Sequence, residues 1–367
     1  MKNIWHDLPR PFFILAPMEA VTDVVFRHVV KQAAPPDLFF TEFTNATGWV
    51  HAGEKAIRGR LIKTDDEQPI IAQIWGGEVG DMAQLATYCR DLGYDGIDIN
   101  MGCPAKSAVK SGGSALIRKP QLAAEAIAAA KTAGLPVSVK TRLGYTHVDE
   151  WHDWLTHLLQ QDIVNLTIHL RTKKEMSKVP AHFELIPEIV ALRDEIAPQT
   201  LITINGDIRD RAHGEELVKQ YGVDGVMIGR GIFHNPFAFA TESNPIASLP
   251  AVSSEAAPKT PLPSYASLRR SLVAGPVTLS EGTSAARVSP AAYARETRSE
   301  AVLLDLLNYH LDLYDQWQPQ LGRPFETLKR FFKIYVRDFP DAAALREQLM
   351  NTKTTDEVRN IIKKAAP

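Results

Sequence analysis

The chain has 367 residues, of which 45% are hydrophobic and 23% are charged, and its formal net charge is −2. These are ordinary values for a globular protein, and the length allows one large domain with a smaller one, or two medium-sized domains. A charge so close to zero excludes a general affinity for nucleic acid, so binding of any polyanion would need a local basic surface.

The two cysteines are too few for a disulfide framework, which predicts a reducing, cytoplasmic setting. Cys89 has the spacing of an apolar position on a helix and is predicted to be a core residue. The N-terminal residues Met1–Leu8 contain no apolar segment of the kind that directs secretion, and no window approaches 18 uninterrupted apolar residues. The sequence therefore predicts neither secretion nor a membrane span.

Eight short apolar runs, rich in β-branched residues, alternate with longer amphipathic segments over the first 230 residues. They are continuous rather than alternating in polarity, as expected for strands buried on both faces. The runs are Phe12–Ala16, Leu38–Phe43, Ile70–Trp75, Gly96–Asn100, Val137–Thr141, Asn165–His169, Leu201–Asn205 and Val226–Gly229.

The segments between the runs have helix signals. Thr22–Ala34 carries the acidic Asp23 in its first turn, and the helices predicted at Asp81–Leu92 and Pro120–Ala133 are each followed by a glycine. Eight strand–helix alternations over about 220 residues favour a closed (β/α)₈ TIM barrel, an α/β fold that typically has ~250 residues. An open, doubly wound sheet is the alternative.

Polar side chains suited to chemistry follow nearly every predicted strand. Singly, each has an ordinary structural explanation, but in a barrel the carboxyl ends of the strands form one ring, where active sites of this fold lie. The residues of this ring are Met18, Glu19, Glu42, Gln73, Asn100, Cys103, Lys140, Arg142, His169, Arg171, Asn205, Asp207, Gly229 and Arg230.

Cys103 lies in a Gly-Cys-Pro turn at the end of the fourth run, with a glycine-rich stretch, Ser111–Ala115, just behind it. A lone intracellular cysteine is usually a small buried hydrophobe. Here, however, the next residue is a proline that cannot donate a backbone hydrogen bond, and the turn holds the thiol at the ring of polar residues. The pattern therefore indicates a positioned thiol.

The last two loops predict a phosphate site. Asn205–Asp207 and Gly229–Arg230 occupy the positions where barrels commonly bind phosphate through glycine N–H groups, and Arg230 would add a charge-assisted contact. The chain has neither a G-x-G-x-x-G nor a G-x-x-x-x-G-K-[ST] motif, and no metal site is expected, because the histidines are scattered and Cys103 has no partner at ligand spacing. The phosphate of flavin mononucleotide (FMN) is the preferred ligand.

Taken together and in order, these motifs resemble those of the tRNA-dihydrouridine synthases, over roughly residues 10 to 240. The matching segments are Ala16–Asp23, Gln73–Gly76, Asp98–Pro104, Val139–Gly144, Ile168–Thr172, Asn205–Asp207 and Gly229–Arg230.

The resemblance implies an FMN across the barrel mouth, NADPH as the reductant and a uridine in tRNA as the substrate. The residues that it implies for cofactor binding are Pro17, Met18, Glu19, Gln73, Lys140, His169, Asn205, Gly206, Asp207, Gly229 and Arg230. Asn100, Arg142 and Arg171 are implied to contact the substrate.

In the chemistry that the resemblance implies, a hydride passes to one carbon of the uracil 5,6 double bond and the other carbon is protonated. Cys103 is the expected acid, because a thiol near its usual pKa of ~8.5 is mostly protonated at neutral pH. Lys140 beside the cofactor can balance negative charge, and the Asn100 amide can bind the uracil edge. Because a base in folded tRNA is stacked, it must be drawn out into this pocket.

Three positions depart from the family pattern, and they bear on the fit of the substrate more than on flavin binding. Glu19 replaces a small residue, Leu170 replaces a glycine, and Ser107 stands where many relatives carry lysine. The run Thr172–His182 also lacks an expected aromatic residue. Cys103 and the phosphate loops are unaffected.

Beyond the barrel domain, 1–240, the composition changes. Residues 241–298 are rich in Ser, Pro, Ala and Thr and predict a flexible linker or insertion. Helical periodicity returns in 299–367, with helices expected at Ala301–Trp317 and Phe325–Phe339, followed by two short ones reaching Ala365. The resemblance makes this a tRNA-binding helical domain.

A locally basic stretch on the second of these helices is the candidate RNA contact. Its cations are Arg323, Lys329, Arg330, Lys333 and Arg337, of which Lys329, Arg330 and Lys333 are the predicted substrate-binding residues. A solvated helix face is the alternative, and phosphate contacts would weaken steeply with salt.

Two other functions stay open at this point, and both would keep part of the pattern. One is a barrel flavoprotein that reduces a free small molecule, and the other is a tRNA-binding chaperone without catalysis. We expect a monomer, without a metal or a membrane partner.

Overall fold

The structure, a computed structural model, describes residues 3–57, 59–109, 112–241 and 300–365. The described chain forms two compact units, one built from residues 3–31 and 35–239 and the other mainly from residues 300–365. The linker predicted at 241–298 lies, except for its first residue, outside the described residues.

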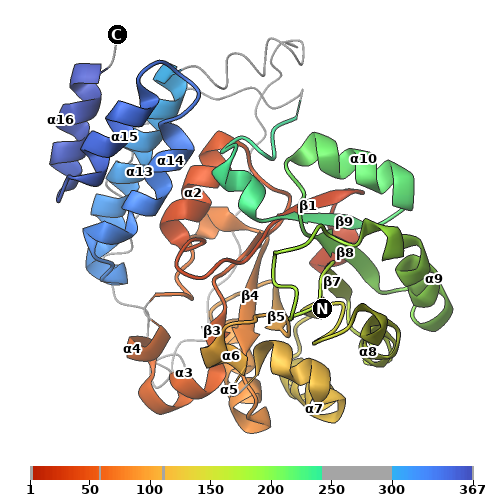
Figure 1. The fold of residues 1–367 in the computed structure, drawn as a ribbon. Helices are drawn as coiled ribbons and strands as arrows, with labels where there is room; N and C mark the ends of the chain where they lie inside the picture. The colour runs from red at the N-terminus through yellow and green to blue at the C-terminus, as the bar shows by residue number, and fades with distance from the viewer. Residues whose placement is uncertain (1–2, 58, 110–111, 242–299, 366–367) are drawn as a thin grey trace. The chain divides into compact units, whose positions relative to one another are not determined.

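The first unit is a barrel of parallel strands (Figure 1). The sheet runs in the order β1-β9-β8-β7-β6-β5-β4-β2, and a parallel bridge between Ile14 and Leu38 joins its two ends. This closure excludes the open-sheet alternative and confirms the (β/α)₈ prediction. The strands are β1 Phe12–Leu15, β2 Phe39–Phe40, β3 Thr44–Asn45, β4 Ile70–Trp75, β5 Gly96–Asn100, β6 Val137–Arg142, β7 Asn165–His169, β8 Leu201–Asn205 and β9 Gly225–Ile228.

All eight apolar runs lie in this sheet, and nearly every strand residue is buried, as their continuous hydrophobicity predicts. The second run differs in one respect. Only its residues Phe39–Phe40 form a strand, β2, and β3 begins at Thr44, just beyond the run; both strands pair with β4. At the core of the barrel, Trp5 packs edge-on against Phe12 and Phe40, with ring centroids 5.7 and 6.4 Å apart.

Helices surround the barrel, and their ends carry the predicted signals. The Asp23 carboxylate accepts a hydrogen bond from the Phe26 N–H at 3.0 Å, and Gly93 and Gly134 adopt positive φ after α5 and α7. The helices are α1 Ile4–Asp7, α2 Val24–Ala33, α3 Ala46–Ala52, α4 Glu54–Ile57, α5 Val79–Asp91, α6 Lys106–Val109, α7 Pro120–Lys131, α8 Trp151–Leu159, α9 Ile186–Ile196 and α10 Arg211–Tyr221.

The second unit is helical. Its α-helices are α13 Glu300–Leu321, α14 Phe332–Tyr335, α15 Ala342–Met350 and α16 Thr355–Ala365. The prediction of one helix over Phe325–Phe339 is wrong: the segment consists of two 3₁₀ turns, Phe325–Thr327 and Lys329–Phe331, followed by the four residues of α14. Val336 has a non-helical ψ of 84° and Asp338 has a φ of +60°, so the helix stops before Pro340.

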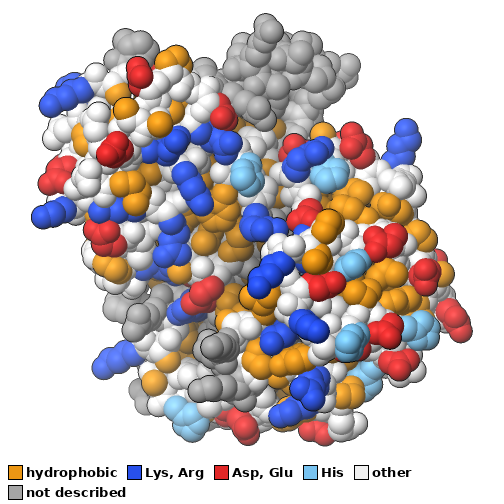
Figure 2. Space-filling view, viewed as in Figure 1, with side chains coloured by type: hydrophobic (Ala, Val, Ile, Leu, Met, Phe, Trp, Pro, Cys, Tyr) orange, Lys and Arg blue, Asp and Glu red, His pale blue; other side chains and the backbone are white. Residues whose placement is uncertain are grey.

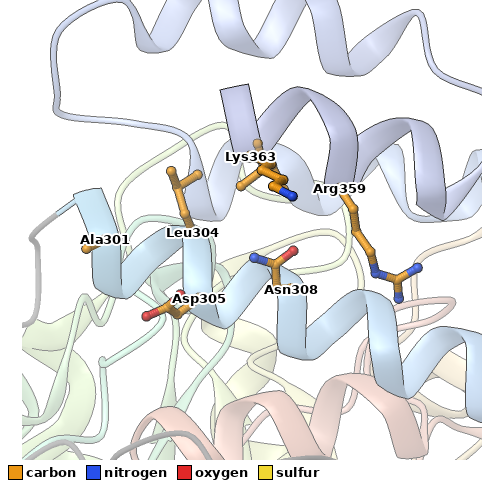
Figure 3. Close-up of a pocket in the computed structure, with 7 residues that line it drawn as sticks. Ala301, Leu304, Asp305, Asn308, Arg359 and Lys363 are labelled. Atoms are coloured by element: carbon orange, nitrogen blue, oxygen red, sulfur yellow. The ribbon is translucent and has the colours of Figure 1, made fainter. Parts of the chain in front are cut away.

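The core of the helical unit contains a buried polar pair. His310 Nδ1 lies 2.6 Å from the Tyr335 hydroxyl, and burial lowers the pKa of His310 to about 3, so the imidazole is neutral. On the outside, α13 and α16 border a groove of about 470 Å³ (Figure 3). The groove is lined by Ala301, Leu304, Asp305, Asn308, Arg359, Ile362 and Lys363. Among the described residues, no helix is long and apolar enough to cross a membrane.

Candidate active site at the barrel mouth

The parallel register brings the predicted polar residues together at the carboxyl ends of the strands. Gln73 on β4 is paired with Asp98 on β5, and Asn100 at the end of β5 is paired with Lys140 on β6. Further round the barrel, His169 at the end of β7 lies between Arg142 and Asn205 in the register. The predicted ring of strand-end residues is therefore present from β4 to β8.

Cys103 is held in its turn from both sides. The Asn100 side-chain oxygen accepts hydrogen bonds from the N–H groups of Gly102 and Cys103, at 3.0 and 2.9 Å. On the other side, the Cys103 carbonyl accepts from the Ser114 N–H at 3.1 Å. The half-buried thiol has a raised pKa because burial disfavours the thiolate more than Arg142 and Lys140 favour it. The site thus presents a fixed, protonated thiol.

The glycine-rich stretch behind the turn makes this arrangement possible. Gly113 has a φ of +55°, and a Cβ there would lie 3.0 Å from the Cys103 carbonyl oxygen. A Cβ on Gly112 would lie 2.7 Å from the carbonyl oxygen of Gly76. Gly113 therefore allows the backbone to approach the cysteine turn closely, and Gly112 allows it to approach the residue after β4.

Lys140 is a partly buried cation beside this turn. Its ammonium group donates to the Asn205 side-chain oxygen at 3.2 Å. Burial lowers the pKa of Lys140 to about 8, with Arg142 adding to the effect and Asp98 opposing it. Lys140 is therefore mostly charged at neutral pH but titrates within a physiologically accessible range.

Arg142 ties the cysteine turn to the loop after β7. Its guanidinium donates to the carbonyl oxygens of Gly102 at 2.8 Å, Thr172 at 3.1 Å and Met176 at 2.9 Å. Burial lowers the pKa of Arg142 to about 10, so the group stays charged at neutral pH. The loop whose sequence departs from the family pattern is thus organised by Arg142.

Next to Lys140 and Arg142, the loops after β7, β8 and β9 carry a second cationic cluster. Asp207 accepts hydrogen bonds from Arg171 and, at 3.2 Å, from Arg230, and these cations hold the pKa of its carboxyl below the usual range. The Arg171 guanidinium also donates to His169 Nε2 at 3.1 Å. Because His169 is buried among Lys140 and these arginines, its pKa lies well below the usual value and the ring is neutral. Its proton is then on Nδ1.

The loops after β8 and β9 fit a phosphate. The backbone N–H groups of Gly206, Asp207 and Arg230 donate to no acceptor within the part of the chain that the structure describes. Gly206 has a φ of +119°, and a Cβ there would lie 3.1 Å from the His169 ring. Free N–H groups, a glycine that leaves space and two nearby arginines match the requirements of an anion site. The Asp207 carboxylate would itself repel a phosphate, and its hydrogen bonds to Arg171 and Arg230 orient these two arginines.

The residues after β1 form another part of the mouth. The Met18 N–H donates to the Thr22 hydroxyl at 2.9 Å, which fixes the Pro17–Met18 turn. Glu19 is exposed and forms an ion pair with Arg60. The buried Glu42 also interacts electrostatically with Arg60. A charged residue at position 19 is therefore accommodated by a partner from a neighbouring loop.

Sequence reasoning missed Asp98 and Ser138. The fully buried Asp98 carboxylate accepts from Ser138 at 2.6 Å and from the Gln73 amide at 2.7 Å. Burial raises the pKa of Asp98 to about 6. A signal was available: Asp98 and Asn100 are two residues apart on one strand, so both side chains point to the same face. Among the described residues, no cluster of three or more His, Cys, Asp or Glu could hold a metal ion.

The three predicted RNA contacts of the helical unit do not lie on one helix. Lys329 and Arg330 lie in a 3₁₀ turn and Lys333 in α14. Lys329 forms an ion pair with Glu326 at 3.0 Å and lies over the ring of Phe325. Arg330 and Lys333 are exposed. These residues belong to a different unit from Cys103.

The fold and the mouth together define a (β/α)₈ barrel protein with a cysteine held in a turn at the mouth and a cluster of arginines beside it. Residues 14–260 match the family model described as "Dihydrouridine synthase (Dus)". The chain belongs to this family.

Proteins of similar length resemble the whole chain. A protein of Bacillus subtilis (strain 168), "Probable tRNA-dihydrouridine synthase 2", is 53% identical over 98% of this chain and 96% of its own length. Proteins named "Probable tRNA-dihydrouridine synthase" from Staphylococcus epidermidis (strain ATCC 35984) and Staphylococcus aureus (strain COL) are each 50% identical over 98% of this chain and 95% of their own lengths.

Proposed function

We propose that this protein reduces the 5,6 double bond of a uridine in tRNA to give dihydrouridine, with Cys103 as the proton donor. The names of relatives at 50–53% identity over nearly the whole chain support the reaction. The observation that carries the assignment of the acid is the fixed, half-buried thiol with a raised pKa at the mouth of the barrel.

Cys103 suits proton donation for two reasons. Its raised pKa keeps the thiol protonated at neutral pH, and the hydrogen bonds to its backbone N–H and carbonyl hold the turn that carries the thiol. Arg142 and Lys140 lie close enough to influence its pKa, so the thiolate left after proton transfer would be stabilised by both cations. The thiol regains its proton from solvent.

The proposed cofactor is FMN; Gly206 and Arg230 would hold its phosphate, and Gln73 and Lys140 would contact its ring system. When bound, it would supply the transfer of hydride from NADPH to the uracil ring. Pro17, Met18, Glu19, His169, Asn205, Asp207 and Gly229 are the other proposed cofactor residues. Lys140 would place a positive charge beside the ring, and neutral His169 would offer its Nδ1–H as a donor.

Substrate contacts are proposed at Asn100, Arg142 and Arg171. Asn100 already uses its oxygen and one N–H within the protein, which leaves a second amide hydrogen for the base. Arg142 uses three of its five donors on carbonyl oxygens, so two remain. We further propose residues 1–240 as the catalytic domain and 299–367 as the tRNA-binding domain.

The test has two parts. The purified protein should be yellow, and with NADPH it should form dihydrouridine in tRNA isolated from a strain that lacks it, at a position found by mapping. Reduction of free uridine at a comparable rate would favour a small-molecule reductase instead. Salt-sensitive tRNA binding without any flavin or product would favour the chaperone.

A further inference from the structure

A chain of buried hydrogen bonds runs from the barrel interior to the cysteine turn. It begins at Asp98, whose carboxylate accepts from the Gln73 amide nitrogen at 2.7 Å. The Gln73 oxygen accepts from the Asn100 amide nitrogen at 3.0 Å. The Asn100 oxygen then accepts from the N–H groups of Gly102 and Cys103. Asp98, Gln73 and Asn100 are all at most 6% exposed.

The chemistry of the two ends determines the direction of this chain. A carboxylate can only accept hydrogen bonds, so the Gln73 amide must turn its nitrogen towards Asp98 and its oxygen towards Asn100. A backbone N–H can only donate, so Asn100 must turn its oxygen towards Cys103 and its nitrogen towards Gln73. Both requirements are met by the same orientation of the two amides. Reversing either amide would place buried donors or acceptors against their own kind.

We propose that Asp98 is a positioning residue that acts through Gln73 and Asn100 to hold the turn that carries Cys103. This inference rests on the proposed function, in which Cys103 is the proton donor. In it, the position of the Cys103 thiol depends on the Asp98 carboxylate, which acts through the side chains of Gln73 and Asn100. Asp98 also fixes the orientation of the Gln73 amide, which is proposed to contact the cofactor. This amide cannot rotate while its nitrogen donates to the Asp98 carboxylate.

The hydrogen-bond chain can be disrupted by exchanging one amide for a carboxylate, and restored by the opposite exchange at its other end. In Asn100→Asp, the new carboxylate can still accept from Gly102 and Cys103, but its other oxygen faces the Gln73 oxygen. If Gln73 turns over, its oxygen faces Asp98 instead, so one carboxyl group must take up a proton. Adding Asp98→Asn removes the conflict, because the chain then runs in reverse. The amide introduced at position 98 donates to Gln73, which in turn donates to the carboxylate introduced at position 100.

The experiment compares the full-length wild type, Asn100→Asp and the double variant Asp98→Asn/Asn100→Asp. Hydrogen exchange is followed for the Gly102 and Cys103 amides at pH 8, and denaturant unfolding is measured from pH 7 to pH 9. In Asn100→Asp, repulsion between the new carboxylate and the Gln73 oxygen should displace the side chain from the Gly102 and Cys103 N–H groups, so we expect their exchange to be at least about tenfold faster. Its folding equilibrium constant should fall relative to wild type by up to about tenfold per pH unit, because the folded state needs an extra proton. The double variant should resemble wild type in both measurements.

Ser138→Ala is the matched control, because it removes the other hydrogen bond to Asp98 and leaves the bond to Gln73. It should not change exchange at Gly102 and Cys103. The role of Asp98 would be overturned if Asn100→Asp showed the hydrogen exchange and the pH dependence of unfolding of the wild type. It would also be overturned if the double variant recovered neither property. Both measurements are independent of turnover, so an intact chain in a protein that forms no dihydrouridine would reject the proposed function alone.

Discussion

Positive charge is handled differently in the two units of this protein. At the barrel mouth, Arg142 is buried and donates to three backbone carbonyls, which carry no net charge. In the helical unit, Arg359 forms ion pairs with Asp312, Asp315 and Asp356, each within 3.2 Å. Figure 2 shows acidic and basic side chains interspersed over the helices of this unit.

The difference has a chemical meaning. Carbonyl dipoles hold a guanidinium in place without cancelling its charge, so the mouth keeps a positive field for an anion. An arginine surrounded by carboxylates contributes little field beyond its own partners. Lys140 and Arg142, whose hydrogen-bond partners are neutral, therefore keep their charge available at the mouth, and substitutions around the mouth should have larger effects than substitutions in the helical unit.

The largest effect is expected for Cys103→Ala. Loss of the general acid should lower the rate of dihydrouridine formation by about 10²–10⁴-fold, because proton donation contributes about this much to catalysis. Flavin content and flavin reduction by NADPH should stay at wild-type levels. The measurement is product formation in tRNA alongside single-turnover flavin reduction, and an unchanged product yield would remove Cys103 from the mechanism.

Gly206→Ala should weaken FMN binding by roughly tenfold to a hundredfold, because strain and crowding at a left-handed glycine position cost about 1–3 kcal/mol. The matched control is Gly222→Ala at the end of α10. Gly222 also has a positive φ, +71°, but a Cβ there meets nothing within 4 Å. The control should lose stability and keep its affinity. Equal flavin loss in both variants would show that Gly206 acts through stability alone.

The lowered pKa of Lys140 predicts that the rate of turnover depends on pH. Its pKa of about 8 means that the positive charge is lost as the pH rises through this value, so turnover should fall on the alkaline side by up to about tenfold per pH unit. Lys140→Arg keeps its charge to much higher pH and should move this fall upwards. The check is the pH–rate profile of both proteins, and identical alkaline limbs would exclude Lys140 as the titrating group.

The smallest effect is expected in the helical unit. Replacing Lys329, Arg330 and Lys333 by alanine should weaken tRNA binding several-fold. The slope of the logarithm of the binding constant against the logarithm of the salt concentration should become shallower by up to ~0.9 for each cation removed. The control is the triple alanine variant of the exposed Lys353, Lys363 and Lys364, which changes the net charge equally. If both variants change the slope to the same extent, the contribution is general electrostatics and not a specific contact.

The sequence predicted the strands of the barrel well because each is signalled by its own apolar run, whereas closure was decided by the bridge between Ile14 and Leu38. It predicted the ring of strand-end residues because the carboxyl ends of parallel strands lie together. It could not predict contacts that depend on side-chain direction. Asn100 was expected to meet the substrate, and that its side-chain oxygen also holds the Cys103 turn was not foreseen. The helix expected to run from Phe325 failed because it depends on local turn geometry around Val336 and Asp338.

Arg142 also limits how the sequence can vary. One planar group joins three carbonyls on two loops, and a lysine, with a single nitrogen on a flexible stem, cannot reproduce that fork. An exchange of these similar residues, harmless at most surface sites, would release the cysteine turn and the Thr172–Met176 loop together. Arg142 therefore cannot be replaced by a chemically similar residue without loss of these contacts. The two loops that it joins can change only together.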